Sequence, residues 1–140
     1  RNTLYMVYCT FLYMLDMIHY VILFFTFFSK EYYYFLGSAL FNILLKEALC
    51  PLLAHWPRVN HILRRPNSSS FGMPSGHCQI YFMFITHLLL KYKLGMFWFC
   101  IFFFYGYQVA CERVVSEKHT WLQTFVGAMI GIFLAFFIKK

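Results

Sequence analysis

Charged residues are scarce in this sequence of 140 residues, where they make up 12%, and only five residues are acidic. A soluble domain usually has about 25% charged residues and roughly 45–50% apolar ones. Here the apolar fraction is 61%, and 19 Phe and 11 Tyr contribute much of it. Because a soluble fold of this length has no place for so much apolar surface, the composition predicts a membrane protein.

The sequence also lacks the residue patterns of a metal site. It has no cluster of carboxylates, and no pair of cysteines has metal-ligand spacing. The five cysteines are scattered and lie mostly within apolar runs: Cys9, Cys50, Cys78, Cys100 and Cys111. We interpret them as small apolar packing residues.

The formal charge of +7 is not gathered into a basic stripe. The cations fall in short loops between apolar runs, without the interleaved polar residues of a nucleic-acid surface. We therefore expect no nucleic-acid partner. The loop cations instead orient the chain in a membrane or belong to an anion site.

The sequence has no internal repeat and no low-complexity segment. Hydropathy separates five apolar runs within or near the length that crosses a bilayer as a helix: residues 4–28, 32–54, 77–91, 94–111 and 119–138. This pattern predicts an all-α fold, a polytopic membrane helix bundle with about five transmembrane helices, in a single domain over residues 1–140. The chain begins at Arg1 rather than at Met, which leaves open whether residues precede it.

Five spans put alternate loops on opposite sides of the membrane. Residues 55–76 and 112–118 then share one side with the N-terminus, and the other side carries Lys30, Lys91, Lys93, Lys139 and Lys140. The two loops are rich in His, Arg, Ser and Gly, and we expect them to converge on a functional site. If the lysine-bearing side is cytoplasmic, the site faces away from the cytoplasm.

The first candidate segment runs from Pro57 to Pro66 and predicts a short helix, since proline suits a first helical turn and also ends a helix. Arg58 and Arg65 are two turns apart on this helix, on one face and roughly 10 Å from each other. Two guanidinium groups at this spacing can bind a phosphate group through paired hydrogen bonds. Taken alone, the segment is better explained as a basic interfacial helix that binds lipid headgroups.

The second candidate segment is a turn rich in glycine and proline, followed by an apolar helix that begins near His77. Ser75 and Gly76 lie at the N-terminus of this helix, where backbone N–H groups and the helix dipole favour a phosphate. His77 is close enough to exchange a proton with it. A loop with a capping serine and an incidental histidine explains this segment equally well on its own.

The third candidate segment leads into the last apolar run. His119 and Gln123 are four residues apart on one helix face, so the amide oxygen of Gln123 can accept the Nδ1 proton of His119. Nε2 is then free to attack phosphorus in line, with Arg113 holding the equatorial oxygens. The alternative is a histidine that caps a helix beside an interfacial tryptophan. Gly127 and Gly131 have the spacing of closely packed membrane helices.

Together the three segments form a pattern that none of them has alone. In chain order they read Arg58-x6-Arg65-Pro66, Pro74-Ser75-Gly76-His77 and Arg113-x5-His119. Over roughly residues 40–138, the sequence therefore resembles the type 2 phosphatidic acid phosphatase superfamily. Residues 72–79 and 119–123 look most like the dolichyldiphosphatases, which recycle dolichyl pyrophosphate.

The resemblance implies that His119 is the nucleophile that forms a phosphohistidine and that His77 is the general acid for the leaving group. Gln123 would orient the nucleophile. Three arginines would bind phosphate oxygens, and two residues at the helix start would complete the oxyanion cradle. These five residues are Arg58, Arg65, Arg113, Ser75 and Gly76.

The resemblance also implies a setting for this chemistry. The substrate would be a lipid phosphate or pyrophosphate, and neither a metal ion nor another cofactor would be required. The enzyme would reside in the endoplasmic reticulum membrane, with its active site on the lumenal side, and would serve protein glycosylation.

Three positions depart from the superfamily pattern. Arg58 stands where a lysine is usual, and Lys46 is an alternative for this cation, although the spacing along the chain favours Arg58. Gln123 stands where many relatives have Asp, but the dolichyldiphosphatases share the glutamine. Glu112 stands where a serine is usual, and its carboxylate can pair with Arg113 and compete with the substrate.

Three functions follow from these observations. Hydrolysis of dolichyl or another polyprenyl pyrophosphate to the monophosphate leads. A phosphatase for phosphatidate or a sphingoid-base phosphate is second, because tail recognition needs only apolar groove walls. The third is a catalytically silent membrane protein that binds lipid phosphate. Because a mere binder has no need of either histidine, the placement of His77 and His119 in one cavity discriminates against it.

Overall fold

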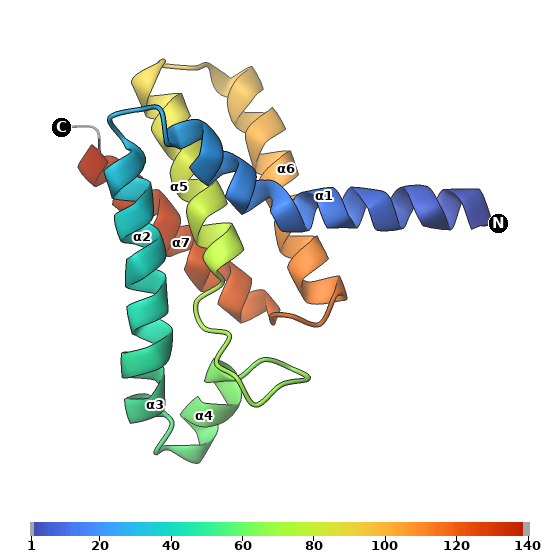
Figure 1. The fold of residues 1–140 in the computed structure, drawn as a ribbon, viewed down its shortest axis with the longest axis vertical. Coiled ribbons are helices and arrows are strands. Elements are labelled where there is room, and N and C mark those ends of the chain that lie inside the picture. Colours follow the sequence, from blue (N-terminus) through green and yellow to red (C-terminus); the bar gives the residue numbers. More distant parts are fainter. Residues whose placement is uncertain (1, 139–140) are drawn as a thin grey trace.

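The computed structural model describes residues 2–138, and within that range the chain is all-helical, with no β-strand. This confirms the predicted all-α fold. The helices are α1 (Asn2–Thr26), α2 (Tyr32–Leu44), the π-helix η1 (Leu45–Leu49), α3 (Cys50–Leu53), α4 (Pro57–Leu63), α5 (Gly76–Lys91), α6 (Met96–Val115) and α7 (Trp121–Ile138). Figure 1 shows the longer ones gathered around α5, with α4 and the loop after it at one end.

Helix α5 is the centre of the bundle. It contacts α1, α2, α6 and α7, and its contact with α7 is the most extensive in the molecule. Its sequence is apolar on nearly all sides, which is typical of a helix surrounded by other helices. Helix α1 crosses over α5, and its N-terminal half projects beyond the other helices (Figure 1).

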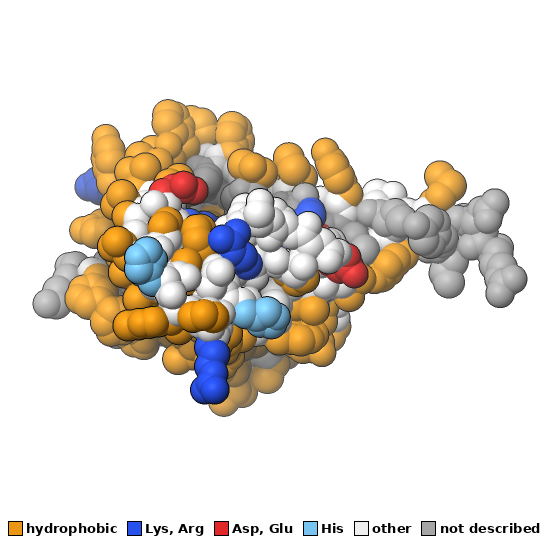
Figure 2. All heavy atoms as spheres, turned by 90° about the horizontal axis from the view of Figure 1, so that it is seen from below, with side chains coloured by type: hydrophobic (Ala, Val, Ile, Leu, Met, Phe, Trp, Pro, Cys, Tyr) orange, Lys and Arg blue, Asp and Glu red, His pale blue; other side chains and the backbone are white. Residues whose placement is uncertain are grey.

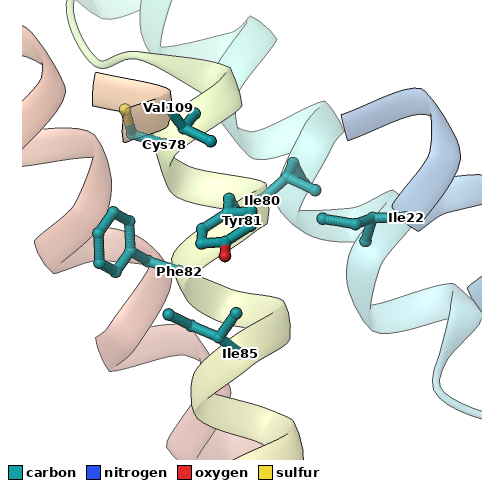
Figure 3. Close-up of a cluster of buried hydrophobic side chains, with 7 residues drawn as sticks. All are labelled: Ile22, Cys78, Ile80, Tyr81, Phe82, Ile85 and Val109. Carbon is teal, nitrogen blue, oxygen red and sulfur yellow. The ribbon is translucent and has the colours of Figure 1, made fainter. Parts of the chain in front are cut away.

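The apolar core is built around α5, as Figure 3 shows. Ile22 of α1 and Val109 of α6 meet a set of side chains from α5, namely Cys78, Ile80, Tyr81, Phe82 and Ile85. Cys78 is fully buried and Cys50 is nearly so, as expected of packing residues, whereas Cys100 is exposed.

Two glycines of α7 allow its backbone to touch that of α5. A Cβ atom at Gly127 would lie 2.4 Å from the carbonyl oxygen of Ser75, and one at Gly131 would lie 2.1 Å from that of Gln79. No real Cβ atom sits at such distances, so only glycine permits this approach. The close packing predicted from the spacing of these glycines is confirmed, and it holds the start of α5 against the middle of α7.

Helix α2 widens into η1 just before a proline. The N–H of Cys50 donates to the carbonyl of Leu45, five residues earlier. Pro51 has no N–H to donate and its ring crowds the preceding turn, which accounts for the local π geometry. Lys46 lies within this widened segment.

Among the described residues, two stretches of helix are long and apolar enough to cross a membrane, Tyr32–Leu53 and Trp121–Ile138. Their mean hydropathy is 1.5 and 2.0, yet only 17% and 33% of the residues in their most apolar windows are buried inside the protein. Apolar helices with so much exposed surface are unlike the core helices of soluble proteins. The expected count of about five spans is not confirmed. Helix α5, with 16 residues, is shorter than the roughly 20 residues that cross a bilayer.

The end of the bundle away from α4 is held by an ion pair between two helices. Lys91 of α5 donates to the carboxylate of Glu31, just before α2, with Nζ and Oε1 2.6 Å apart. This hydrogen bond lowers the pKa of Glu31 to about 2. His87 Nε2 lies 3.8 Å from the same oxygen. This ion pair ties the C-terminal end of α5 to the start of α2, at the end of the bundle remote from the candidate site.

Candidate active site

A cavity of about 230 Å³ lies where the predicted site segments meet. It is lined by residues of α2, η1, the loop before α5, α5 itself, α6 and the loop before α7. The lining residues are Ala39, Asn42, Ile43, Lys46, Arg65, Gly76, His77, Ile80, Arg113 and His119. One wall is apolar, and the rest carries two histidines and three cations.

The polar face of the molecule is the end that carries α4 and the loop after it. Viewed from that end, basic, acidic and histidine side chains gather among other polar atoms, and apolar side chains surround them (Figure 2). Such a polar area with an apolar rim fits a protein end that emerges from hydrocarbon into water.

Gln123 fixes the tautomer of His119. Its Nε2 donates to two backbone carbonyls, that of Ile62 at 2.9 Å and that of Arg64 at 2.7 Å. Because carbonyl oxygens only accept, the amide orientation is determined, and Oε1 must face His119 Nδ1, 3.2 Å away. Nδ1 therefore carries the proton and Nε2 keeps its lone pair. Oε1 also accepts from the N–H of Thr120 at 3.2 Å.

The surroundings of His119 keep its imidazole neutral. His119 lies in the loop before α7 and is buried, with 2% of its surface exposed. Burial first, and then the positive charges of Arg113, Lys46 and Arg65, lower the pKa of His119 to about 3, although the hydrogen bond to Gln123 acts in the opposite direction. At neutral pH the ring is uncharged, which is the form that acts as a nucleophile.

Gly72 brings its backbone against these side chains. A Cβ atom at this position would lie 2.4 Å from Gln123 Oε1 and 2.9 Å from Arg65 Cγ. The N–H of Gly72 donates to the carbonyl of Leu63 at 2.8 Å, which closes the loop onto the end of α4. The absence of a side chain at Gly72 thus makes room for Gln123, which is hydrogen-bonded to His119.

The two loops expected to converge do so. Asn67 Nδ2 donates to the carboxylate of Glu117, and the N–H of Ser75 donates to the carbonyl of Gln123 at 3.0 Å. With the bonds from Gln123 to the carbonyls before the loop, these contacts tie residues 55–76 to the start of α7. The predicted convergence of the two loops is confirmed, although the count of spans from which it was argued is not.

The start of α5 brings its first residues to the cavity. Gly76 and His77 line it, and the first N–H groups of a helix have no acceptor within the helix, so they favour an anion there. Ser75 is fully buried but is not a lining residue. Of the two residues predicted to form the oxyanion cradle, Gly76 lines the cavity and Ser75 does not.

Arg113 lines the cavity and also shapes the loop before His119. Its carbonyl accepts hydrogen bonds from the N–H groups of Lys118 at 3.1 Å and His119 at 3.0 Å. Its side chain is buried, and Nη1 lies 3.3 Å from the carboxylate of Glu112. The pairing of Glu112 with Arg113 expected from the sequence is thus present.

The prediction that Arg58 and Arg65 share a helix face is wrong. Helix α4 ends at Leu63 and Arg64 is extended, with φ −80° and ψ 154°, so Arg65 lies outside the helix. Arg58 is exposed and does not line the cavity, whereas Lys46 does. The spacing along the sequence favoured Arg58 over Lys46. It did not account for α3 and α4, two separate short helices that lie between Lys46 and the loop.

A buried polar network beside the cavity was missed. Gln79 donates through Nε2 to the carbonyl and the hydroxyl of Ser38, both at 2.9 Å, and its Oε1 accepts from Asn42 at 2.7 Å. Asn42 also donates to the carbonyl of Pro74 at 3.3 Å. The sequence carried a sign of this network, since Ser38, Asn42 and Lys46 recur every four residues along a largely apolar stretch. The network joins α2 to the start of α5.

Among the described residues, no group of three or more His, Cys, Asp or Glu side chains lies close enough together to hold a metal ion.

Comparison with known proteins gives one match. A family model of the PAP2 superfamily matches residues 32–140, which includes every residue of the cavity and leaves out α1. No curated protein and no solved structure matches the chain.

Proposed function

Because the chain belongs to the PAP2 superfamily, we propose that it hydrolyses dolichyl or another polyprenyl pyrophosphate to the monophosphate and inorganic phosphate, through a phosphohistidine. Membership implies phosphatase activity on lipid phosphates. The observation that carries the proposal is one cavity that holds a neutral histidine with its Nε2 lone pair free, a second histidine and three cations.

In the first step, the lone pair of His119 Nε2 attacks the terminal phosphorus, and the bond from phosphorus to the bridging oxygen breaks. The bridging oxygen takes a proton from His77, and the lipid monophosphate leaves. Negative charge on the equatorial oxygens is stabilised by Lys46, Arg65 and Arg113, together with the N-terminal end of α5. Lys46 takes the role that the sequence pattern suggested for Arg58.

In the second step, water attacks the phosphorus of the phosphohistidine and gives a proton to His77. The bond from phosphorus to nitrogen breaks, its electron pair returns to Nε2, and inorganic phosphate leaves. The phosphorylated ring carries a positive charge, and the bond from Nδ1 to Gln123 Oε1 stabilises it. Gln123 is thus a positioning residue, since it acts through His119.

The lipid chain of the bound substrate extends from the site along the apolar wall of the cavity. An in-line displacement puts the leaving group opposite His119, on the side of the general acid His77. Ile80 follows His77 by one turn of α5, and Ala39 and Ile43 face the same cavity from α2. We infer that the isoprenoid chain runs between α2 and α5 and stays within hydrocarbon.

The proposed setting is a membrane crossed by five segments: α1, the continuous stretch of α2, η1 and α3, and then α5, α6 and α7. The exposed apolar side chains along α6 and α7 support this, among them Phe104, Phe125 and Phe133. The site then opens at one membrane surface, and the distribution of lysines favours the side away from the cytoplasm. The resemblance to the dolichyldiphosphatases suggests the endoplasmic reticulum membrane, with the site on its lumenal side.

The choice of a polyprenyl pyrophosphate rests on the likeness of residues 72–79 and of Gln123 to the dolichyldiphosphatases. A phosphatase for phosphatidate or a sphingoid-base phosphate is the second candidate, because the apolar wall formed by Ala39, Ile43 and Ile80 fits any lipid tail.

The test is phosphate release from dolichyl pyrophosphate and from phosphatidate, in detergent with EDTA. The unaltered chain is compared with His119→Ala and His77→Ala, and with His61→Ala as a matched control, because His61 is exposed on α4. We expect the unaltered chain to release phosphate faster from dolichyl pyrophosphate than from phosphatidate. Release should be lost in His119→Ala and His77→Ala and kept in His61→Ala. Release from phosphatidate alone would favour the second candidate. No release from either lipid would refute the enzymatic function and leave a protein that only binds lipid phosphate.

A further inference from the structure

Glu112 is a buried acid at the edge of a basic cavity. Only 2% of the surface of Glu112 is exposed. Its carboxylate lies between two cations, with Oε2 3.3 Å from Arg113 Nη1 and Oε1 3.8 Å from Lys118 Nζ. Glu112 does not line the cavity, but Arg113 does. The carboxylate therefore acts on anything bound in the cavity through the guanidinium group that both contact.

Three cations line the cavity, and Glu112 reduces the repulsion between them. Lys46, Arg65 and Arg113 surround a space whose histidine nucleophile is held neutral, so their charges repel each other in a region partly shielded from water. Glu112 offsets one of these charges. A bound phosphate offsets them as well. Because the carboxylate and the phosphate neutralise the same cations, the carboxylate weakens the attraction of the cavity for phosphate.

From this geometry we propose that Glu112 is a positioning residue that holds Arg113 and lowers the affinity of the cavity for inorganic phosphate, so that the product is released. The inference rests on the proposed function, because inorganic phosphate is its product. We expect the carboxylate to weaken phosphate binding roughly tenfold, on the order of the effect of one nearby unit charge at an effective dielectric constant near 20.

The test is the binding of inorganic phosphate to the purified protein and to Glu112→Gln. The amide keeps the shape of the side chain and can still accept a hydrogen bond from Arg113, but it lacks the charge. We expect Glu112→Gln to bind phosphate roughly tenfold more tightly and to show a larger rise of Tm when phosphate is added. In lipid hydrolysis, both KM and kcat should fall, since phosphate then leaves more slowly.

Three controls separate charge from shape and from folding. Glu112→Asp keeps the charge and should bind phosphate like the unaltered protein. Glu47→Gln removes a carboxylate next to the cavity residue Lys46, but Glu47 is exposed to solvent, so phosphate affinity should not change. If Glu112→Gln does not fold, Glu112→Ser removes the same charge, and the same tightening is expected.

Unchanged or weaker phosphate binding in a folded, neutral variant would overturn the inference and leave the proposed function intact. If the unaltered protein binds no phosphate and releases none from lipid, the proposed function fails, and the inference fails with it. Tighter binding that is lost when Arg113→Lys is added to Glu112→Gln would support the route through Arg113.

Discussion

One added methyl group at Gly72 should disable the nucleophile while the helix bundle remains folded. In Gly72→Ala, the new Cβ would lie 2.4 Å from Gln123 Oε1 and 3.0 Å from its Cδ. The backbone at Gly72 has no positive φ, so alanine itself is not strained there. The clash must therefore be relieved by movement of the Gln123 amide or of the loop.

The size of the effect follows from these distances. An ordinary contact begins at 3.4 Å, so the amide oxygen must move by about 1 Å. Gln123 cannot turn freely, because its Nε2 is bound to two carbonyls, and the movement therefore stretches the bond of 3.2 Å to His119 Nδ1. A misplacement of about 1 Å in a catalytic group lowers rate by roughly 100-fold. Overpacking should lower stability by about 1–3 kcal/mol.

The assay is phosphate release from dolichyl pyrophosphate, with Tm measured on the same samples. We expect kcat of Gly72→Ala to fall by roughly 100-fold with a modest fall in Tm. Gly37→Ala is the matched control, because no atom lies within 4 Å of a Cβ at Gly37 in α2, and its activity should be unchanged. A folded Gly72→Ala protein with nearly unaltered kcat would refute the role of Gln123 in holding the nucleophile.

Three further predictions concern packing, protonation and the choice of cation. Gly131→Ala puts a Cβ 2.1 Å from the carbonyl oxygen of Gln79, which is backbone and cannot turn aside, so Tm should fall sharply; a Tm within a degree of the unaltered protein would contradict the close α5–α7 contact. His119 should stay neutral as pH falls to 5, because its pKa is lowered to about 3, and nitrogen NMR of labelled histidine should show the tautomer with the proton on Nδ1; titration near pH 6.5 would contradict this. Lys46→Met should lower kcat/KM by roughly 100-fold, the loss typical of one preorganised charge contact, whereas Arg58→Met should change it little; the reverse order would restore Arg58 as the phosphate ligand.

The long helices were predictable because each is an apolar run with a clear break at either end. The expected segments 4–28 and 119–138 correspond to Asn2–Thr26 and Trp121–Ile138, within a few residues. The contact of α5 with α7 was also signalled by the spacing of Gly127 and Gly131, since membrane helices that touch closely need small residues.

Much of the site was predictable because its chemistry is local. The spacing of His119 and Gln123 predicted a hydrogen bond between them, and the structure shows it. The predicted shared helix face is wrong, because α7 begins at Trp121 and His119 lies in the loop before it. Arg65, Gly76, His77 and Arg113 line the same cavity as His119.

The rest depended on how the chain turns between helices. The wider turn before Pro51 and the short helices α3 and α4 decide that Lys46 rather than Arg58 lines the cavity, and spacing along the sequence does not reveal this. The partners of Gln123 on the loop side are backbone carbonyls, which have no signature in the sequence.

The central claim is that His119 attacks through Nε2, and the most direct test is to trap the intermediate. The protein is mixed with a lipid pyrophosphate whose terminal phosphate is labelled, and the reaction is stopped in alkali, which preserves phosphohistidine. Peptide mapping by mass spectrometry and phosphorus NMR then locates the label. We predict phosphate on Nε2 of His119 and none in His119→Asn, because Nδ1 is held by Gln123. Label on Nδ1, label on another residue, or turnover without a labelled protein would contradict the account.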